Sequence, residues 1–186
     1  MPDGFRAQVG QAGIFPVPEN ILEPGDVKMW KKNRKTYLFW IALAEGVGLL
    51  SGLLSRAGTE QFGQTAAQPP LSPPAILFPI VWTVLYALMG IGAARVSLAP
   101  DSQARNRGLN LFIAQLIVNF FWSLIFFNAQ AYGFAFFWLL LLLGLVVWMT
   151  LTFRKSDSLA AWLQIPYVVW LVFAGYLNLG VWILNA

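Results

Sequence analysis

Three long stretches of this chain carry no charged side chain. Residues 108–153 contain no Lys, Arg, Asp or Glu over 46 positions, and the same is true of residues 61–94 and 158–186. A soluble domain of this size does not keep so much of its chain uncharged, whereas a membrane span needs only about 20 mainly apolar residues. The sequence therefore predicts an integral membrane protein whose main partner is the lipid bilayer.

The apolar stretches divide into five predicted transmembrane helices. Residues 108–153 would be ~69 Å long as one helix, about twice the thickness of the hydrocarbon layer, so they must form two spans. The break between these spans falls at the polar patch Asn128–Gly133. We expect an all-α membrane protein, a bundle of five transmembrane helices. The helices are expected at about Tyr37–Ser55, Ala75–Val96, Leu109–Phe127, Tyr132–Phe153 and Leu159–Leu184.

Basic residues lie almost entirely on one side of this predicted bundle. With five spans, the N-terminus and the loops after the second and fourth helices share a side, which holds all of the 12 Lys and Arg residues except Arg56. Because cytosolic loops are enriched in Lys and Arg, we expect a cytoplasmic-membrane protein with a cytosolic N-terminus and an external C-terminus. Residues 1–35 are predicted to be a partly disordered cytosolic leader, and residues 36–186 a transmembrane ligand-binding domain.

The composition removes several kinds of chemistry. The chain has no Cys and no His, which excludes thiolate and imidazole metal ligands, a Cys nucleophile and ligation of haem by His. It has no P-loop, zinc signature or acid–base pair for hydrolysis. Haem ligation by Met or Tyr stays open. The net charge of +4 follows from the one-sided Lys and Arg residues, so we expect no nucleic-acid partner and no required cofactor.

Polar and aromatic residues share helix faces inside the second and third predicted spans. Trp82 and Tyr86 are four residues apart on an otherwise apolar face, and Gln115 and Asn119 have the same spacing. Carboxamides inside a span are costly unless they are paired. These groups either bond between helices and hold the bundle together, or they contact a ligand. The spacing alone leaves both interpretations open.

The last predicted span carries a similar stripe. Pro166, Trp170, Ala174, Asn178 and Trp182 follow one another at steps of four, so the stripe turns slowly around the helix. Pro166 frees a carbonyl group about one turn upstream, because proline cannot donate a backbone hydrogen bond. The small side chain of Ala174 among large rings leaves room for close packing or for a ligand.

Glu45 is the one ionisable residue well inside a predicted span. An acid in this position is a candidate functional group, and it is expected to be protonated or paired. The amides of Gln115 and Asn119 are its candidate partners, since Arg56 is three turns away. A single acid without His, Lys or a second acid nearby cannot form a proton relay. This favours a neutral hydrogen bond between helices.

Residues 69–90, which read PPLSPPAILFPIVWTVLYALMG, closely resemble the loop and second helix of the translocator protein family. These proteins are also called tryptophan-rich sensory proteins or peripheral benzodiazepine receptors. Residues 115–127 are similar to the third helix of the family and residues 165–182 to its fifth. The resemblance covers about residues 41–185, in order. One departure is Thr59–Gln68, which lacks the Trp, Tyr and Lys that many relatives have in this loop.

The resemblance implies a five-helix bundle, commonly a homodimer, with a pocket between the helices under the loop that joins the first two. Family members bind porphyrins, and some bind cholesterol or synthetic ligands. A porphyrin or haem would therefore be a tetrapyrrole ligand and not a required cofactor. By position in the family, the residues that would line this pocket are Trp82, Gln115, Asn119, Tyr167, Trp170, Ala174 and Leu177. Tyr86 lies on the same helix face as Trp82, and we include it as a ligand-binding residue.

Three functions are compatible with these observations. The first is a membrane receptor or carrier that binds tetrapyrroles and takes part in their sensing, transport or stress signalling. The second, suggested by the resemblance, is an enzyme that degrades bound porphyrin with light or oxygen, using the indole of Trp82 or Trp170. The third is a structural or partner-binding membrane protein with a vestigial pocket. We assign no catalytic residue and no metal ligand.

Overall fold

The computed structural model describes residues 24–186, with side chains from residue 33 onward. Most of the predicted leader therefore lies outside the described residues. The described elements are α1 (Pro24–Leu54), α2 (Arg56–Thr65), α3 (Leu77–Leu98), α4 (Gln103–Ser123), the π-helical η1 (Leu124–Asn128), α5 (Tyr132–Phe153), α6 (Ser158–Trp162) and α7 (Ile165–Leu184).

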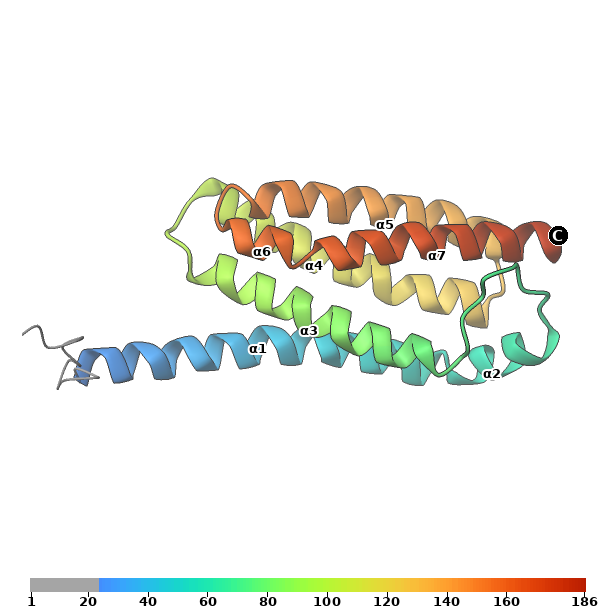
Figure 1. The fold of residues 1–186 in the computed structure, drawn as a ribbon, viewed down its shortest axis with the longest axis horizontal. Coiled ribbons are helices and arrows are strands. Elements are labelled where there is room, and N and C mark those ends of the chain that lie inside the picture. Colours follow the sequence, from blue (N-terminus) through green and yellow to red (C-terminus); the bar gives the residue numbers. More distant parts are fainter. Residues whose placement is uncertain (1–23) are drawn as a thin grey trace, which may run out of the picture.

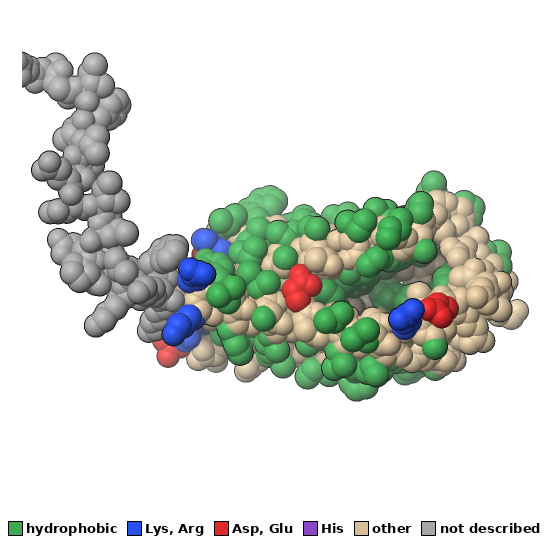
Figure 2. All heavy atoms as spheres, turned by 90° about the horizontal axis from the view of Figure 1, so that it is seen from below, with side chains coloured by type: hydrophobic (Ala, Val, Ile, Leu, Met, Phe, Trp, Pro, Cys, Tyr) green, Lys and Arg blue, Asp and Glu red, His purple; other side chains and the backbone are tan. Residues whose placement is uncertain are grey.

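Five helical segments are long and apolar enough to cross a membrane. Their bounds are Asn33–Leu54, Leu77–Leu98, Gln103–Asn128, Tyr132–Phe153 and Ser158–Leu184. This confirms the predicted all-α fold and its five spans, and it makes the chain a multi-pass membrane protein. Figure 2 shows apolar side chains along one long face, with basic side chains toward its two ends and one acidic side chain near its middle. Such an exterior suits hydrocarbon and not water.

The long helices lie side by side in an elongated bundle (Figure 1). Helix α1 packs mainly on α3, α4 on α5, and α5 on α7. The approach of α1 and α3 is especially close, because a side chain at Gly90 would meet the backbone of Ile41 and one at Gly48 would meet the ring of Tyr86. At one end α1 extends past the other helices, and at the other α2 lies near the C-terminus (Figure 1).

Two helices begin earlier than their apolar stretches suggested. Helix α1 starts at Pro24 and not at Tyr37, because the Lys and Arg residues before the span are good helix formers. Helix α4 starts at Gln103 and not at Leu109, since the Ser102 side chain caps it by accepting a hydrogen bond from the backbone N–H of Arg105. Helix ends are set by caps and propensity, whereas span ends are set by polarity.

The predicted fifth helix is divided in two. Helix α6 ends at Trp162 and α7 begins at Ile165, with Pro166 in the first turn of α7, where a missing N–H removes no intrahelical bond. The Gln164 side chain turns back and donates from Nε2 to the carbonyl of Ala160 at 3.1 Å. This break changes the direction of the chain just before the predicted site residues of α7.

The break between the third and fourth spans falls where the sequence predicted it. The last turn before it is the π-helix η1, and the chain then passes through Ala129–Ala131 to α5. Asn128 ends η1 and donates from Nδ2 to the carbonyl of Leu54 at 2.9 Å. Side chains on a π-helical turn depart from regular α-helical positions. Here the neighbouring rings of Phe126 and Phe127 both contact Phe62 of α2.

Candidate functional site

Four buried, uncharged side chains join the middle of α3, the middle of α4 and the first turns of α7. Tyr167 donates from its hydroxyl to Oε1 of Gln115 at 3.0 Å, and Asn119 donates from Nδ2 to the hydroxyl of Tyr86 at 3.0 Å. Gln115 and Tyr167 are completely buried. We call Tyr86, Gln115, Asn119 and Tyr167 the amide–phenol cluster. The structure thus brings together four of the predicted site residues.

The local sequence explains why these groups meet. Gln115 and Asn119 are one helical turn apart, so both amides leave α4 on the same face. The second hydrogen-bonding group of Gln115, Nε2, reaches Sδ of Met89 at 3.7 Å. Met89 is three residues after Tyr86 and therefore lies on the same face of α3. Each α4 amide therefore has a hydrogen-bond partner on α3, Met89 for Gln115 and Tyr86 for Asn119.

Aromatic rings surround the amide–phenol cluster. The ring of Trp82 lies 5.4 Å from that of Tyr86 and 6.1 Å from that of Tyr167, measured between centroids. The ring of Trp170 lies 5.9 Å from that of Phe78, one turn before Trp82 on α3. Both indoles are only partly buried. Trp82 therefore contacts two rings of the cluster, whereas Trp170 contacts Phe78 on the same helix as Trp82.

The buried stripe of α7 continues past the cluster. Ala174 and Leu177 are buried on α7, and they lie about one and two turns beyond Trp170. Next to them, Asn178 accepts at Oδ1 a hydrogen bond from the indole of Trp122 at 3.3 Å and donates from Nδ2 to the carbonyl of Tyr132 at 2.8 Å. The polar interior of the bundle thus extends from the cluster toward the end covered by α2.

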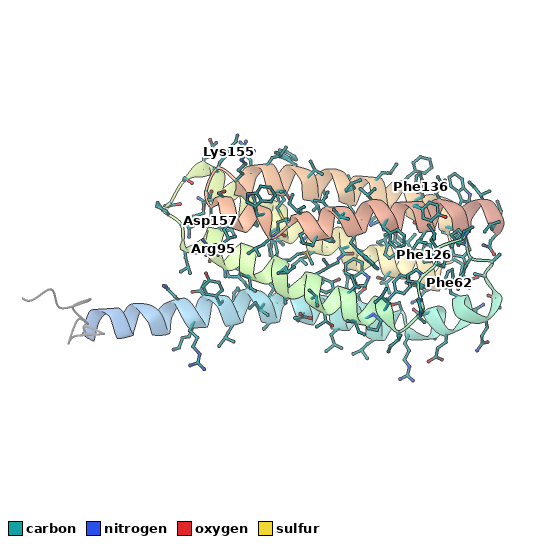
Figure 3. The ribbon with its side chains drawn as sticks, viewed as in Figure 1. Phe62, Arg95, Phe126, Phe136, Lys155 and Asp157 are labelled. Carbon is teal, nitrogen blue, oxygen red and sulfur yellow. The ribbon has the colours of Figure 1, made fainter. Side chains whose placement is uncertain are left out.

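Helix α2 and the loop after it cover that end of the bundle, and we call residues 56–76 the lid. The sequence led us to expect a loop at Thr59–Gln68, but most of this segment is helical. Phe62 packs its ring on Phe126, Phe127 and Tyr132 at centroid distances of 5.3, 5.5 and 6.2 Å. Figure 3 shows Phe62 and Phe126 at the same end of the molecule. Phe62 supplies aromatic cover from a segment without Trp or Tyr.

The lid is tied to α7 by hydrogen bonds to its backbone. Asn185 donates from Nδ2 to the carbonyl of Ala67 and accepts at Oδ1 from the N–H of Ala67, both at 2.9 Å. Tyr176 donates from its hydroxyl to the carbonyl of Pro70 at 2.8 Å. The Pro69 ring packs where a side chain at Gly180 would stand. These contacts hold the proline-rich loop against the C-terminal half of α7.

Glu45 does not make the hydrogen bond that the sequence suggested. Its carboxyl group has no hydrogen-bond partner within residues 24–186, and it lies half-buried on α1. The amides proposed as its partners are engaged elsewhere, Gln115 with Met89 and Tyr167, and Asn119 with Tyr86. Arg56 is also engaged, with Glu60 at 3.1 Å. The prediction was wrong because both amides bond to side chains of α3 and α7 instead.

An ion pair joins α3 to the start of α6 at the opposite end of the bundle from the lid (Figure 3). Arg95 donates from Nε and Nη2 to the two carboxylate oxygens of Asp157 at 3.0 and 2.8 Å. Oδ1 of Asp157 also accepts from the N–H of Ala160 at 2.7 Å. Burial raises the pKa of Asp157, but these hydrogen bonds outweigh it and hold the pKa below its ordinary value of 3.8.

The predicted site residues did not include several that the structure places at or near the site. The spacing of Met89 puts it on the helix face of Trp82 and Tyr86, but it was not predicted as a sulfur acceptor for Gln115. Phe62 and Asn185 gave no such signal, because their roles depend on how the lid folds over the bundle. Within the described part of the chain, no three acidic side chains come close enough to hold a metal ion.

Fold and site together define a class of protein: a five-span membrane protein with an aromatic and amide-lined interior between its second, third and fifth spans. The chain belongs to the TspO/MBR family, whose sequence model matches residues 40–183. This confirms the resemblance found in the sequence.

Individual relatives agree with this assignment. The chain is 41% identical over 120 residues to protein CrtK of Rhodobacter capsulatus, and this alignment covers 63% of this chain and 74% of CrtK. It is 32% identical over 151 residues to the tryptophan-rich protein TspO of Chlorobaculum tepidum, covering 81% of this chain and 96% of that protein. It is 36% identical over 117 residues to the human translocator protein, covering 62% of this chain and 69% of that protein.

Proposed function

We propose that this protein is a membrane receptor or carrier that binds a flat, mainly apolar tetrapyrrole, such as a porphyrin, beside the amide–phenol cluster. The observation that carries the proposal is the meeting of four uncharged polar groups with two partly buried indoles inside a membrane bundle. Its ligand-lining residues are those of the cluster together with Trp82, Trp170, Ala174 and Leu177.

The chemistry of these side chains suits such a ligand. Indole and phenol rings offer flat faces for stacking and apolar contact, and a few fixed polar groups orient a ligand in a mainly apolar pocket. Ala174 leaves space beside these rings. A relative in Chlorobaculum tepidum is named a tryptophan-rich protein and the human relative a translocator protein, which supports a role for indoles and for movement of a ligand.

The cluster is closed in this structure, because its polar groups bond to one another. Binding must therefore exchange some of these bonds for contacts with the ligand. Hydrogen bonds between membrane helices stabilise a protein by ~0.6 kcal/mol on average, whereas a micromolar ligand gains about 8 kcal/mol. The exchange is thus energetically small compared with the binding it permits.

Carboxylates on the ligand would need a cation, and Arg56 is suitably placed. It is the one basic side chain at the lid end among the described residues, and its partner Glu60 is exposed. Arg56 begins α2 directly after the end of α1, the helix on which Gly48 packs on Tyr86. A ligand carboxylate could replace Glu60 as the partner of Arg56 while the flat ring lies beside Tyr86.

We also propose that the protein forms a homodimer and that its N-terminus faces the cytosol. The orientation is supported by the described basic side chains, all of which except Arg56 lie at the end away from the lid. Because the chain has no Cys, a single Cys placed at Ala186 or at Pro100, which are both exposed, can report the side. A membrane-impermeant thiol reagent added to intact cells should label the first and spare the second, and the reverse pattern would invert the topology.

The binding proposal is tested by titrating the purified protein in detergent with protoporphyrin IX and following the Soret absorbance of the ligand. This readout does not lose signal when an indole is removed. Wild type should saturate, and Trp82→Phe and Trp170→Phe should bind about three- to tenfold more weakly, since an aromatic contact is worth roughly 0.5–1.5 kcal/mol. Trp148→Phe is the matched control, because Trp148 is 53% exposed on α5.

Absorbance changes that rise linearly and equally in all four proteins would mean that the porphyrin enters the micelle only. The cluster would then be a structural network that holds α3, α4 and α7 together. A weakening in Trp148→Phe as large as in Trp82→Phe would place the ligand on the outer surface of the bundle and overturn the proposed site.

A further inference from the structure

Helix α1 is the least covered of the five spans. In the most apolar part of Asn33–Leu54, 11% of the residues are buried inside the molecule, against 33–39% in the other four spans. Figure 2 shows the side of the molecule on which α1 lies, with one acidic side chain near its middle. Helix α1 therefore has the most surface left for a further contact within the membrane.

Glu45 lies near the middle of this span and is half-buried. The ion pairs among the described residues are made by other acids, namely Glu60, Asp101 and Asp157. The nearest basic residues along the chain, Lys35 and Arg56, are ten and eleven residues away, or about 15 Å along a helix. A charged acid inside a span is costly unless it is paired. A basic group from outside this chain would supply the partner that the described residues do not provide.

The side chains around Glu45 repeat with the spacing of a helix-packing seam. Successive positions are four, three, four and three residues apart, and this repeat of 3.5 residues keeps two helices in contact when they cross at a small angle. We call the series the α1 row, and it consists of Leu38, Ala42, Glu45, Leu49 and Gly52. Leu38 and Leu49 are 57% and 66% exposed. The α1 row thus offers a second helix a continuous set of contacts, with the acid at its centre.

Small residues allow a second helix to come close to the α1 row. A side chain at Gly46 or Gly52 would meet open space, and Ala42 is exposed. Membrane helices associate through such small residues because their backbones can then approach closely. A basic side chain of the second helix that passes over Gly46 would reach the carboxyl group of Glu45.

We propose that the α1 row docks a transmembrane helix of a partner protein that carries a Lys or Arg at mid-membrane depth. The opposite charges attract most strongly away from water, and the pair removes the cost of leaving Glu45 charged and alone. The proposal is independent of the tetrapyrrole, because the α1 row is on the outside of the bundle and the amide–phenol cluster is buried on other helices.

A second copy of the chain fits the α1 row less well. In a two-fold symmetric interface the same patch meets itself, so two Glu45 side chains would approach each other with no basic residue in the row to separate them. Like charges brought together at an interface disfavour association. A helix with a basic residue removes this difficulty.

A synthetic transmembrane peptide tests the proposal in phosphatidylcholine vesicles, which carry no net charge. The peptide is a Leu and Ala helix of about 20 residues with one Lys at its midpoint, which matches the depth of Glu45 in either orientation. A matched peptide has Leu in place of Lys. Because the chain has no Cys, a dye on a single Cys at Ala186 reports binding of the labelled peptide by energy transfer. Wild type should bind the Lys peptide about tenfold more tightly than the Leu peptide, and Glu45→Gln should lose most of this preference.

Two further variants test whether the contact is on α1. Gly52→Leu fills an open position of the α1 row and should weaken binding of the Lys peptide about threefold. Gly144→Leu is the matched control, because it fills an equally open position on α5, and it should bind like wild type. The double variant Glu45→Leu/Val172→Glu moves the acid to α7, where Val172 is 58% exposed, and should not restore the preference for Lys.

Three outcomes would overturn the proposal. Equal binding of the two peptides to wild type would show that Glu45 attracts no basic group. A restored preference in the double variant would show that any acid exposed to lipid is sufficient, wherever it lies. A loss of energy transfer between two labelled copies in Glu45→Gln, with unchanged peptide binding, would assign the α1 row to a second copy.

Discussion

The amide–phenol cluster and the Arg95–Asp157 pair both join distant parts of the chain, but they use different chemistry. The cluster links α3, α4 and α7 through neutral groups, and Gln115 and Tyr167 are completely buried. The ion pair links α3 to α6 through full charges, and its side chains are 32% and 20% exposed. Neutral hydrogen bonds are thus found in the buried interior, and the ion pair is found where its side chains are partly exposed.

The difference follows from the cost of moving charge away from water. A buried ion pair must recover several kcal/mol of desolvation for each ion, whereas neutral amides and hydroxyls lose far less when they are paired. In the middle of a span, neutral partners are therefore the safer way to fix helix positions. At the end of the bundle, water remains close enough for charges to be tolerated. The following predictions test this comparison.

Asn119→Asp should have the largest effect, because it places a carboxylate beside Tyr86 in the middle of the membrane. We expect several kcal/mol of destabilisation, larger at pH 8 than at pH 5, since protonation removes the charge. Thermal unfolding in detergent micelles at the two pH values measures it. Asn110→Asp is the control on the same helix, and its exposed position should make its effect small. Equal effects of the two variants would break the comparison.

Tyr167→Phe should have an intermediate effect. It removes the hydroxyl that donates to Gln115 and leaves a buried acceptor without its partner, which should destabilise the protein by about 1 kcal/mol. Tyr176→Phe removes a hydroxyl whose residue is 42% exposed and should cost less. Urea or heat unfolding of both variants gives the difference, and a larger loss in Tyr176→Phe would contradict the assigned importance of the cluster.

Asp157→Asn should have the smallest effect. The asparagine can still cap α6, and partly exposed ion pairs stabilise proteins by roughly 0–1 kcal/mol. Because the pKa of Asp157 is held below its ordinary value of 3.8, its contribution should be complete above about pH 4 and disappear as the pH falls through the folded-state pKa. Unfolding measured from pH 3 to pH 6 should show a shallower acid loss in Asp157→Asn. An unchanged acid profile would remove Asp157 as its source.

The parts of this structure that sequence could predict are those set by polarity and periodicity. The five spans follow from uncharged runs, and the inward face of α4 follows from the spacing of Gln115 and Asn119. The choice of partners was not predictable, because it depends on helix packing. Gln115 could have met Glu45, but in the folded bundle it bonds to Tyr167 and Met89.

The lid shows a second limit of sequence reasoning. Its ten-residue helix α2 has two glycines, Gly58 and Gly63, so propensity alone argues against a helix. Tertiary contact overrides this, since Gly58 lies where any side chain would meet the backbone of Phe127. The glycine that weakens the local helix signal is what lets α2 pack on η1.

The central claim is that a porphyrin binds beside the amide–phenol cluster, and the indole N–H signals of the protein test it most directly. The nine Trp residues give nine signals in a ¹⁵N-labelled sample, each assigned by a Trp→Phe variant. A porphyrin ring shifts nuclei close to it. The account predicts large, saturable shifts for Trp82 and Trp170, with Trp148 and Trp162, which are 53% and 68% exposed, unmoved. Shifts confined to Trp148 and Trp162 would contradict it.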